Sequence, residues 1–170
     1  MRSNAKSDKP QKKPRVAISA CLLGQRVRYD GNDKRATALV DALADSVEWV
    51  AMCPETECGL GVPREPMQLI QAKGSVRLIG QESGNDFTAK LENWILKRVD
   101  KMKKENIAGL ILKARSPSCG INSTPIFGAD GQDIGIGSGL FAAAVKKRFP
   151  ELIIIDEEEK DAVGLLSRIL

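Results

Sequence analysis

The sequence predicts an α/β fold in which helices flank a mainly parallel β-sheet. Short apolar runs rich in β-branched residues recur along the chain, and most are followed by a segment whose apolar residues have helical spacing. Strands that alternate with helices form βαβ units, in which the strands are parallel and the helices cover the faces of the sheet. A length of 170 residues and the lack of an internal repeat favour a single domain.

The first half of the chain begins with a buried strand at 15–19, a β-branched apolar run that ends at a turn-like segment. Apolar residues at helical spacing then predict an amphipathic helix over 33–44. A second apolar strand is expected at 47–52, before a long loop rich in glycine, proline and glutamate. The shorter apolar segments 67–71 and 76–79 can pair with each other as a hairpin.

The second half contains the clearest helix, at 86–104, because its apolar residues mark one helical face. A third buried strand is expected at 107–112. The glycine-rich segment 128–139 should be a loop, because glycine weakens both helices and strands. The remaining elements alternate as a helix at 139–148, a strand at 151–156 and a helix at 159–170.

The net charge of +4 comes from the amino terminus. Residues 1–15 hold six of the 26 lysines and arginines and one of the 22 aspartates and glutamates. The rest of the chain therefore has 20 basic and 21 acidic residues, a net charge of about −1. We expect 1–14 to be a disordered basic tail and 15–170 to be the folded domain. Such a tail can also attract a polyanion such as RNA.

The chain has no apolar run near the roughly 20 residues that a membrane span needs. Its amino terminus also lacks the apolar core of a secretory signal, so we expect a cytoplasmic protein that does not contact membranes. Because the cytosol keeps thiols reduced, the four cysteines favour metal binding or catalysis over disulfides. The absence of histidine excludes Ser-His and Cys-His nucleophile pairs and every histidine-containing zinc site.

All four cysteines lie at or after the carboxyl end of a predicted strand. In a parallel sheet these ends share one edge, so Cys21, Cys58 and Cys119 can converge from separate loops. Cys53, at the end of an apolar strand, is better explained by packing. Thiolate groups select zinc or iron-sulfur clusters. Zinc bound by all the cysteines, a 4Fe-4S cluster held by three of them, and a nucleophilic thiol at Cys21 all remain open.

Other reactive side chains flank these cysteines. Glu55 stands three residues before Cys58, and Ser116 stands three residues before Cys119. Without histidine, a carboxylate is the natural group to activate water. Basic residues near the same loops can bind an anionic substrate such as a phosphate. The candidates for this role are Arg28, Arg64, Lys113 and Arg115.

Four ordered segments resemble the thiouracil desulfidase branch of the DUF523 family. These are SACLLG at 19–24, VRYDG at 27–31, CPETECGLGVPRE at 53–65 and KARSPSCG at 113–120. The resemblance implies a single Rossmann-like domain. It also implies a 4Fe-4S cluster held by Cys21, Cys58 and Cys119, with one iron open to substrate. Glu55 and Ser116 would be the catalytic residues.

For the reaction, the resemblance implies hydrolytic, non-redox removal of sulfur as sulfide from 2-thiouracil, 4-thiouracil or 4-thiouridine monophosphate. The open iron would polarise the C–S bond, a water activated by Glu55 would attack the ring carbon, and Ser116 would assist proton transfer or position the ring. A 4-thiouridine in tRNA is an alternative substrate, which the basic tail would favour. The alternative of another class is a zinc-binding or an iron- or redox-sensing protein.

Overall fold

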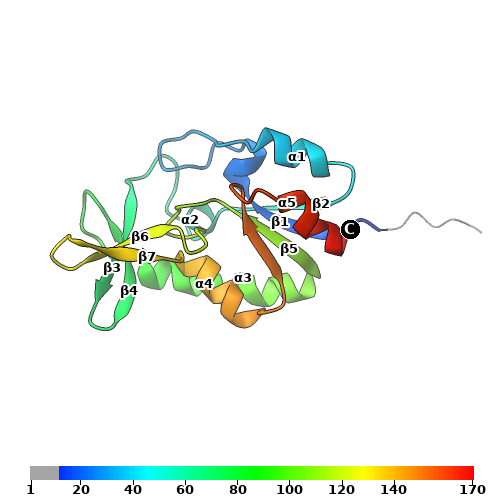
Figure 1. Ribbon diagram of the computed structural model, residues 1–170. Coiled ribbons are helices and arrows are strands. Elements are labelled where there is room, and N and C mark those ends of the chain that lie inside the picture. The colour runs from blue at the N-terminus through cyan, green and yellow to red at the C-terminus, as the bar shows by residue number, and fades with distance from the viewer. Residues whose placement is uncertain (1–11) are drawn as a thin grey trace, which may run out of the picture.

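A parallel sheet, sheet A, forms the centre of the computed structural model, which describes residues 12–170 (Figure 1). Its strands are ordered β2-β1-β5-β8. They are β1 (Arg15–Ser19), β2 (Glu48–Met52), β5 (Ile107–Leu112) and β8 (Ile153–Asp156). Every strand pair in this sheet is parallel, which confirms the predicted fold class and the strands predicted for it.

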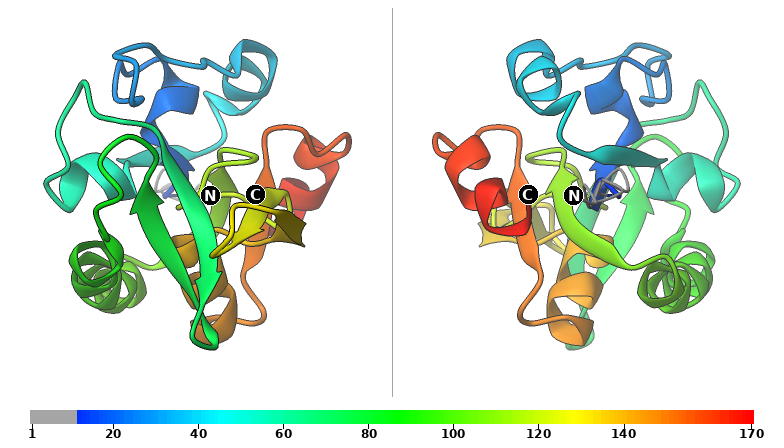
Figure 2. Two further views of the ribbon diagram at one scale, coloured as in Figure 1. Left: turned by 90° about the vertical axis from the view of Figure 1, so that its left-hand side faces the viewer. Right: turned by 90° about the vertical axis from the view of Figure 1, so that its right-hand side faces the viewer.

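Helices cover both faces of sheet A (Figure 2). One layer is α1 (Thr37–Leu43) and α5 (Ala162–Leu166), and the other is α3 (Thr88–Lys104) and α4 (Leu140–Arg148). Alternate residues of β1 serve the two layers, since Val16 and Ile18 pack in the cluster with α1 and Ala17 packs in the cluster with α3. Burial on both faces explains why the central strands β1 and β5 are continuous apolar runs.

A second sheet, sheet B, lies beside α3 and extends beyond the end of sheet A (Figure 1). Its order is β4-β3-β6-β7. The strands are β3 (Met67–Ala72), β4 (Ser75–Gly80), β6 (Thr124–Gly128) and β7 (Asp133–Gly137). The antiparallel β3–β4 pair confirms the predicted hairpin. The sequence did not indicate β6, and the prediction of a loop over 128–139 is wrong because β7 lies within it.

The strand β7 gives little local signal because its sequence is DIGIG, in which glycine alternates with isoleucine. Its isoleucines are also exposed, at 55% for Ile134 and 69% for Ile136, so no buried face marks the strand. Antiparallel pairing with β6, from Thr124 opposite Gly137 onward, supplies its backbone hydrogen bonds. The strand therefore forms because of its partner and not because of its own residues.

Two predicted helices have different bounds in the structure. Helix α1 begins at Thr37, because the Asp33 carboxylate accepts a hydrogen bond from the Arg35 N–H (3.1 Å) and forms a turn before the helix. The helix predicted at 159–170 is reduced to α5 and a 3-10 turn, η2 (Ser167–Ile169).

Two short helices that were not expected follow the first two strands of sheet A directly. The 3-10 helix η1 (Ala20–Leu23) follows β1, and α2 (Pro54–Glu57) follows β2 after Cys53. Pro54 occupies the first turn of α2, where its missing N–H costs no hydrogen bond, and Glu57 Oε1 accepts from the Cys53 N–H (2.8 Å). These two helices carry or flank three of the four cysteines.

Most of the predicted basic tail, residues 1–11, lies outside the described residues. Within residues 12–170, no helix is both long enough and apolar enough to cross a bilayer.

The core predicts different costs for two leucine truncations. Leu110 in β5 is fully buried, whereas Leu96 on α3 is 69% exposed. We expect Leu110→Ala to lower the free energy of unfolding by about 2–5 kcal/mol, because it leaves a cavity between the sheet and α3. Leu96→Ala should change it by roughly 0.5 kcal/mol or less. Chemical denaturation measures both, and equal losses would contradict the described packing of β5.

Candidate active site

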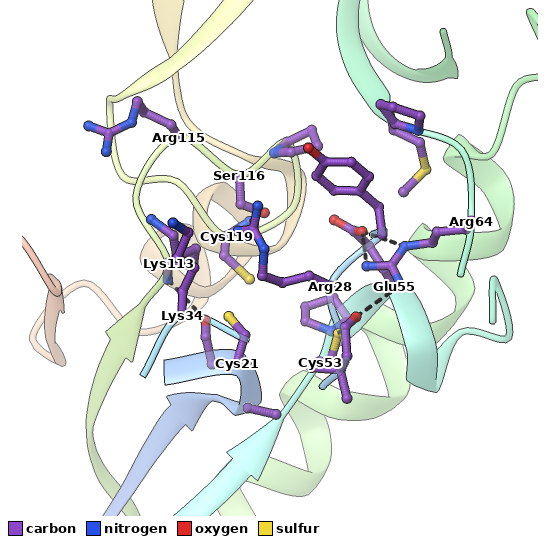
Figure 3. A pocket seen from close by; sticks show the side chains of 18 of the residues that line it. Cys21, Arg28, Lys34, Cys53, Glu55, Arg64, Lys113, Arg115, Ser116 and Cys119 are labelled. Atoms are coloured by element: carbon purple, nitrogen blue, oxygen red, sulfur yellow. Dashed lines mark hydrogen bonds and ion pairs between the residues drawn. The ribbon is translucent and has the colours of Figure 1, made fainter. Parts of the chain in front are cut away.

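A cavity of about 550 Å³ lies at the carboxyl ends of the sheet A strands (Figure 3). In open parallel sheets this edge is where ligands bind, because the loops after several strands meet there. The loops after β1, β2 and β5 supply most of the cavity wall. The reactive residues that line it are Cys21, Arg28, Lys34, Cys53, Glu55, Arg64, Lys113, Arg115, Ser116 and Cys119.

Three of the four cysteines line this cavity, namely Cys21, Cys53 and Cys119. Burial raises the pKa of the Cys21 thiol to about 11, and burial also raises the pKa of the Cys119 thiol. Ionising such buried thiols is costly unless a cation lies against them. They fit a metal centre, because a bound metal supplies that positive charge.

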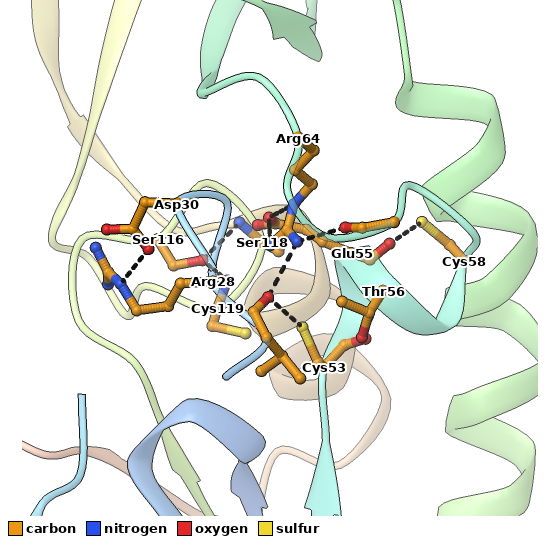
Figure 4. Close-up of polar contacts among 12 residues, drawn as sticks. Arg28, Asp30, Cys53, Glu55, Thr56, Cys58, Arg64, Ser116, Ser118 and Cys119 are labelled. Atoms are coloured by element: carbon orange, nitrogen blue, oxygen red, sulfur yellow. Dashed lines mark hydrogen bonds and ion pairs between the residues drawn. The ribbon is translucent and has the colours of Figure 1, made fainter. Parts of the chain in front are cut away.

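Cys58 does not line the cavity. Its Sγ–H donates to the Glu55 carbonyl oxygen (3.3 Å), and its side chain packs on the core cluster that contains α3. Because Cys53 precedes α2 and Cys58 follows it, the helix separates the two side chains. Figure 4 shows Cys58 beyond Glu55, away from Cys119. The structure therefore brings Cys53 to the cavity beside Cys21, and does not bring the predicted Cys58 there.

The arrangement of the thiols bears on the kind of metal centre. Within residues 12–170, no three histidine, cysteine, aspartate or glutamate side chains lie close enough together to share one metal ion. In a 4Fe-4S cluster each thiolate binds a different iron, so the ligands surround the cluster from separate directions. Three cysteines on three loops around one cavity fit such a cluster.

Glu55 is a buried carboxylate on the cavity wall, with only 9% of the residue exposed. Its Oε2 accepts hydrogen bonds from Arg64 Nε (2.8 Å) and Nη2 (2.5 Å). Its Oε1 accepts one from the Ser118 hydroxyl (2.9 Å) (Figure 4). A carboxylate held in this way can orient a water molecule in the cavity. The structure thus places the predicted catalytic carboxylate beside the thiols.

Ser116 lies on the cavity wall near Cys119 (Figure 3). Its Oγ accepts hydrogen bonds from the backbone N–H groups of Ser118 (3.2 Å) and Cys119 (3.1 Å). A serine oxygen has two acceptor lone pairs and one hydrogen to donate. Because the backbone occupies both lone pairs, the hydroxyl is left to act as a donor toward the cavity.

Contacts with other segments hold both ends of the loop 113–120, which carries Ser116 and Cys119. Near its start, Glu157 pairs with Lys113. Near its end, backbone N–H groups in the first turn of α4 donate to the Ser118 carbonyl oxygen (2.9 and 3.2 Å). Gly139 permits this approach, because a Cβ at that position would lie 2.5 Å from a Ser118 backbone carbon.

Three of the four predicted substrate-binding cations form hydrogen-bonded ion pairs with carboxylates of the protein. The ion pairs are Arg64 with Glu55, Lys113 with Glu157 and Arg115 with Glu158. The Arg115 pair is exposed and the other two are mostly buried. These cations therefore shape the wall of the cavity more than they offer charge to a ligand.

Arg28 and Lys34 are the cavity cations with the fewest protein partners. Arg28 makes one ion pair, with Asp30 at 3.5 Å, and its buried Nε has no hydrogen-bond partner among the described residues. Lys34 lines the cavity and forms no ion pair within residues 12–170. The Tyr29 ring, 5.4 Å from the Arg28 guanidinium, is the aromatic group of the cavity wall. Together these groups can bind an anion beside a flat ring.

Sequence reasoning missed three residues of the site. Ser118 contacts Glu55 and is fully buried, and Tyr29 lies at the cavity. Both stand inside segments that the sequence singled out, KARSPSCG and VRYDG, which was the signal available. Cys53 shared the position after a strand with the other cysteines, but its apolar strand led to a packing interpretation.

Comparison with known proteins places the chain in a family. A family model described as 2-thiouracil desulfurase matches residues 16–158. YbbK of Bacillus subtilis (strain 168), an uncharacterised protein, is 34% identical over 137 residues, which is 78% of this chain and 89% of YbbK. The solved structure of the 4Fe-4S-dependent thiouracil desulfidase TudS is 30% identical, with a TM-score of 0.74 over 93% of this chain and 100% of that chain. The chain therefore belongs to the 2-thiouracil desulfurase family.

Proposed function

We propose that the protein removes sulfur from thiolated uracil compounds with the help of a 4Fe-4S cluster. The observation that carries the proposal is the shared cavity, where three thiols, a buried carboxylate and a serine hydroxyl face the same space. Membership of the 2-thiouracil desulfurase family and the likeness to a 4Fe-4S-dependent thiouracil desulfidase support it.

The proposed cluster ligands are Cys21, Cys53 and Cys119. All three line the cavity and come from the loops after three adjacent parallel strands. The sequence-based choice of Cys58 as the third ligand is the alternative. For that choice, the thiol would have to leave the Glu55 carbonyl oxygen, to which it donates at 3.3 Å.

The proposed chemistry is hydrolytic and needs no electron donor. A bound cluster would supply a Lewis acid, at its iron without a protein ligand, that polarises the thiocarbonyl bond. Glu55 accepts a proton from the water that attacks the ring carbon. Ser116 donates its hydroxyl hydrogen bond to the pyrimidine and positions the ring. Attack forms a C–O bond and moves the π electrons of the thiocarbonyl onto sulfur. The C–S bond then breaks with its electron pair on sulfur, and the oxygen loses its remaining proton to form the carbonyl. One water is thus exchanged for one hydrogen sulfide.

The cavity favours an anionic substrate, so 4-thiouridine monophosphate fits better than free 2- or 4-thiouracil. Arg28 and Lys34 offer positive charge, and Tyr29, which is 40% exposed, offers a ring face to a pyrimidine. A tRNA substrate that depends on the basic tail is less favoured. Lys12 and Lys13 lie in a groove with Lys104, before β1 and β5 begin, so they stand at the amino end of sheet A, opposite the cavity.

Serine replacements distinguish the two candidates for the third ligand. We expect Cys53→Ser to lose most of the bound iron and the visible absorbance of the cluster after anaerobic reconstitution, because one of three thiolates is gone. Cys58→Ser is the matched control and should keep both, since its thiol contacts the Glu55 backbone and not the cavity. The reverse pattern would return the ligand role to Cys58.

The reaction itself is tested by following the loss of the thiocarbonyl absorbance of 4-thiouracil and 4-thiouridine monophosphate without oxygen. We expect turnover in the reconstituted protein and none in the apoprotein. Glu55→Gln should keep the cluster but lose roughly 100-fold or more in kcat, the usual contribution of a general base.

The matched control for this substitution is Glu92→Gln, which neutralises an exposed glutamate on α3 and should leave kcat unchanged. Normal turnover in cluster-loaded Glu55→Gln would remove the assigned role of Glu55. A colourless, iron-free protein that binds zinc would favour the zinc-binding or sensing class instead.

Arg28 should distinguish the nucleotide from the free base. With the monophosphate as substrate, we expect Arg28→Gln to raise the Michaelis constant roughly tenfold, about 1.4 kcal/mol, because it removes one charge from the phosphate site. With the free base as substrate, the Michaelis constant should change little, since that molecule has no phosphate. Steady-state kinetics on both substrates measure the difference, and equal changes in the two constants would contradict a phosphate contact.

A further inference from the structure

Both oxygens of the Glu55 carboxylate are held, but not to the same extent. Oε2 accepts two hydrogen bonds from the Arg64 guanidinium, at 2.8 and 2.5 Å, whereas Oε1 accepts one, from Ser118 at 2.9 Å. A carboxylate oxygen has two lone-pair sites. The contacts with Arg64 therefore fill Oε2, and one site on Oε1 is left over. In Figure 3 the oxygen that does not contact Arg64 points into the cavity.

Arg64 cannot hold Glu55 and a substrate at the same time in this arrangement. Its Nη1 donates to the carbonyl oxygens of Val27 (3.0 Å) and Gly61 (2.9 Å), so each nitrogen of the guanidinium already has a protein partner. Only 7% of its side chain is exposed. The Arg64 N–H also donates to the Tyr29 carbonyl oxygen (2.9 Å). Arg64 thus joins α2 to the loop that carries Arg28 and Tyr29.

Ser118, in the loop 113–120, is the second partner of the Glu55 carboxylate. It has no exposed surface, and it is 63 residues away from Glu55 in the sequence. Its carbonyl oxygen accepts the N–H groups that begin α4, so its position is fixed by the core. The carboxylate is therefore held between Arg64 and Ser118, which lie in two segments far apart in the sequence.

We propose that Arg64 and Ser118 are positioning residues for Glu55, and that they leave Oε1 as the oxygen that accepts the proton of the attacking water. This inference rests on the proposed function and deepens it. It also reassigns Arg64, which the sequence suggested as a substrate-binding residue. A positioning role predicts a loss of kcat with little change in KM, whereas a substrate contact predicts the reverse for the phosphorylated substrate.

The test uses Arg64→Lys and Ser118→Ala in the cluster-loaded enzyme. Lysine keeps the charge but has a single nitrogen, so it cannot direct two N–H donors from separate nitrogens onto Oε2. We expect kcat to fall roughly 10- to 100-fold for Arg64→Lys and roughly tenfold for Ser118→Ala, the scale of a misplaced reacting group. With either substrate, the free base or the monophosphate, KM should stay within roughly threefold of that of the unmodified protein. Iron content and the cluster absorbance should not change.

Combination with Glu55→Gln separates positioning from a general structural defect. If both residues act through Glu55, then adding either substitution to Glu55→Gln should reduce kcat by no more than roughly twofold. A full further loss in that background would overturn the proposal. So would unchanged kcat in both single variants, loss of the cluster in both, or a raised KM for the monophosphate alone.

Two matched controls come from elsewhere in the fold. Arg77 holds Asp86 with the same Nε and Nη2 pattern (2.9 and 2.5 Å), and Thr88 is a buried hydroxyl that accepts from the Leu78 N–H (2.8 Å). Arg77→Lys and Thr88→Val should leave kcat and KM unchanged even where they lower thermal stability. If the unmodified, cluster-loaded protein turns over neither substrate, the proposed function itself fails. If it turns over and the single variants do too, only the positioning roles fail.

Discussion

Parallel pairing of β1 with β2 and with β5 is the constraint on which the whole site depends. It brings the ends of three strands to one edge, so that cysteines almost a hundred residues apart in the sequence line one cavity. Val16, Ala17 and Ile18 of β1 are fully buried between two helical layers. The cavity therefore lies at the end of a buried strand, and short helices and turns in its loops are enough to orient the side chains.

The sequence predicted sheet A well because its strands are mainly apolar runs, and the central strands β1 and β5 are buried on both faces. Sheet B was predicted only in part, since the strands of the β3–β4 hairpin have apolar residues without proline, whereas proline or glycine interrupts β6 and β7. Pro125 removes a backbone donor from β6, and glycine occupies alternate positions of β7. Such strands form because a neighbouring strand pairs with them, and the residues of the strand alone do not predict that pairing.

The same contrast holds within the site. Position after a strand was enough to select Cys21 and Cys119, but the choice between Cys53 and Cys58 depends on the direction of side chains around α2, a helix of one turn. The ion pairs that the predicted cations form could also not be predicted from the sequence. The acidic partners of Lys113 and Arg115 lie 44 and 43 residues away, in the segment after β8. The sequence could predict which residue types lie in which loop of the site. It could not predict which acidic side chain pairs with each cation, because that depends on how the loops pack together.

The buried ion pair of Glu55 with Arg64 is a weak contribution to stability, because removing two charges from water offsets most of their attraction. The ion pair instead neutralises the charge of Glu55 and fixes the orientation of its carboxylate. An unpaired carboxylate on the cavity wall would repel any anionic ligand, including the substrate and the sulfide of the proposed reaction. The guanidinium cancels that charge, so Arg28 and Lys34 set the sign of the field that a ligand meets. In a chain without histidine, this pairing is how a carboxylate can stay available to a water molecule without excluding an anion from the same cavity.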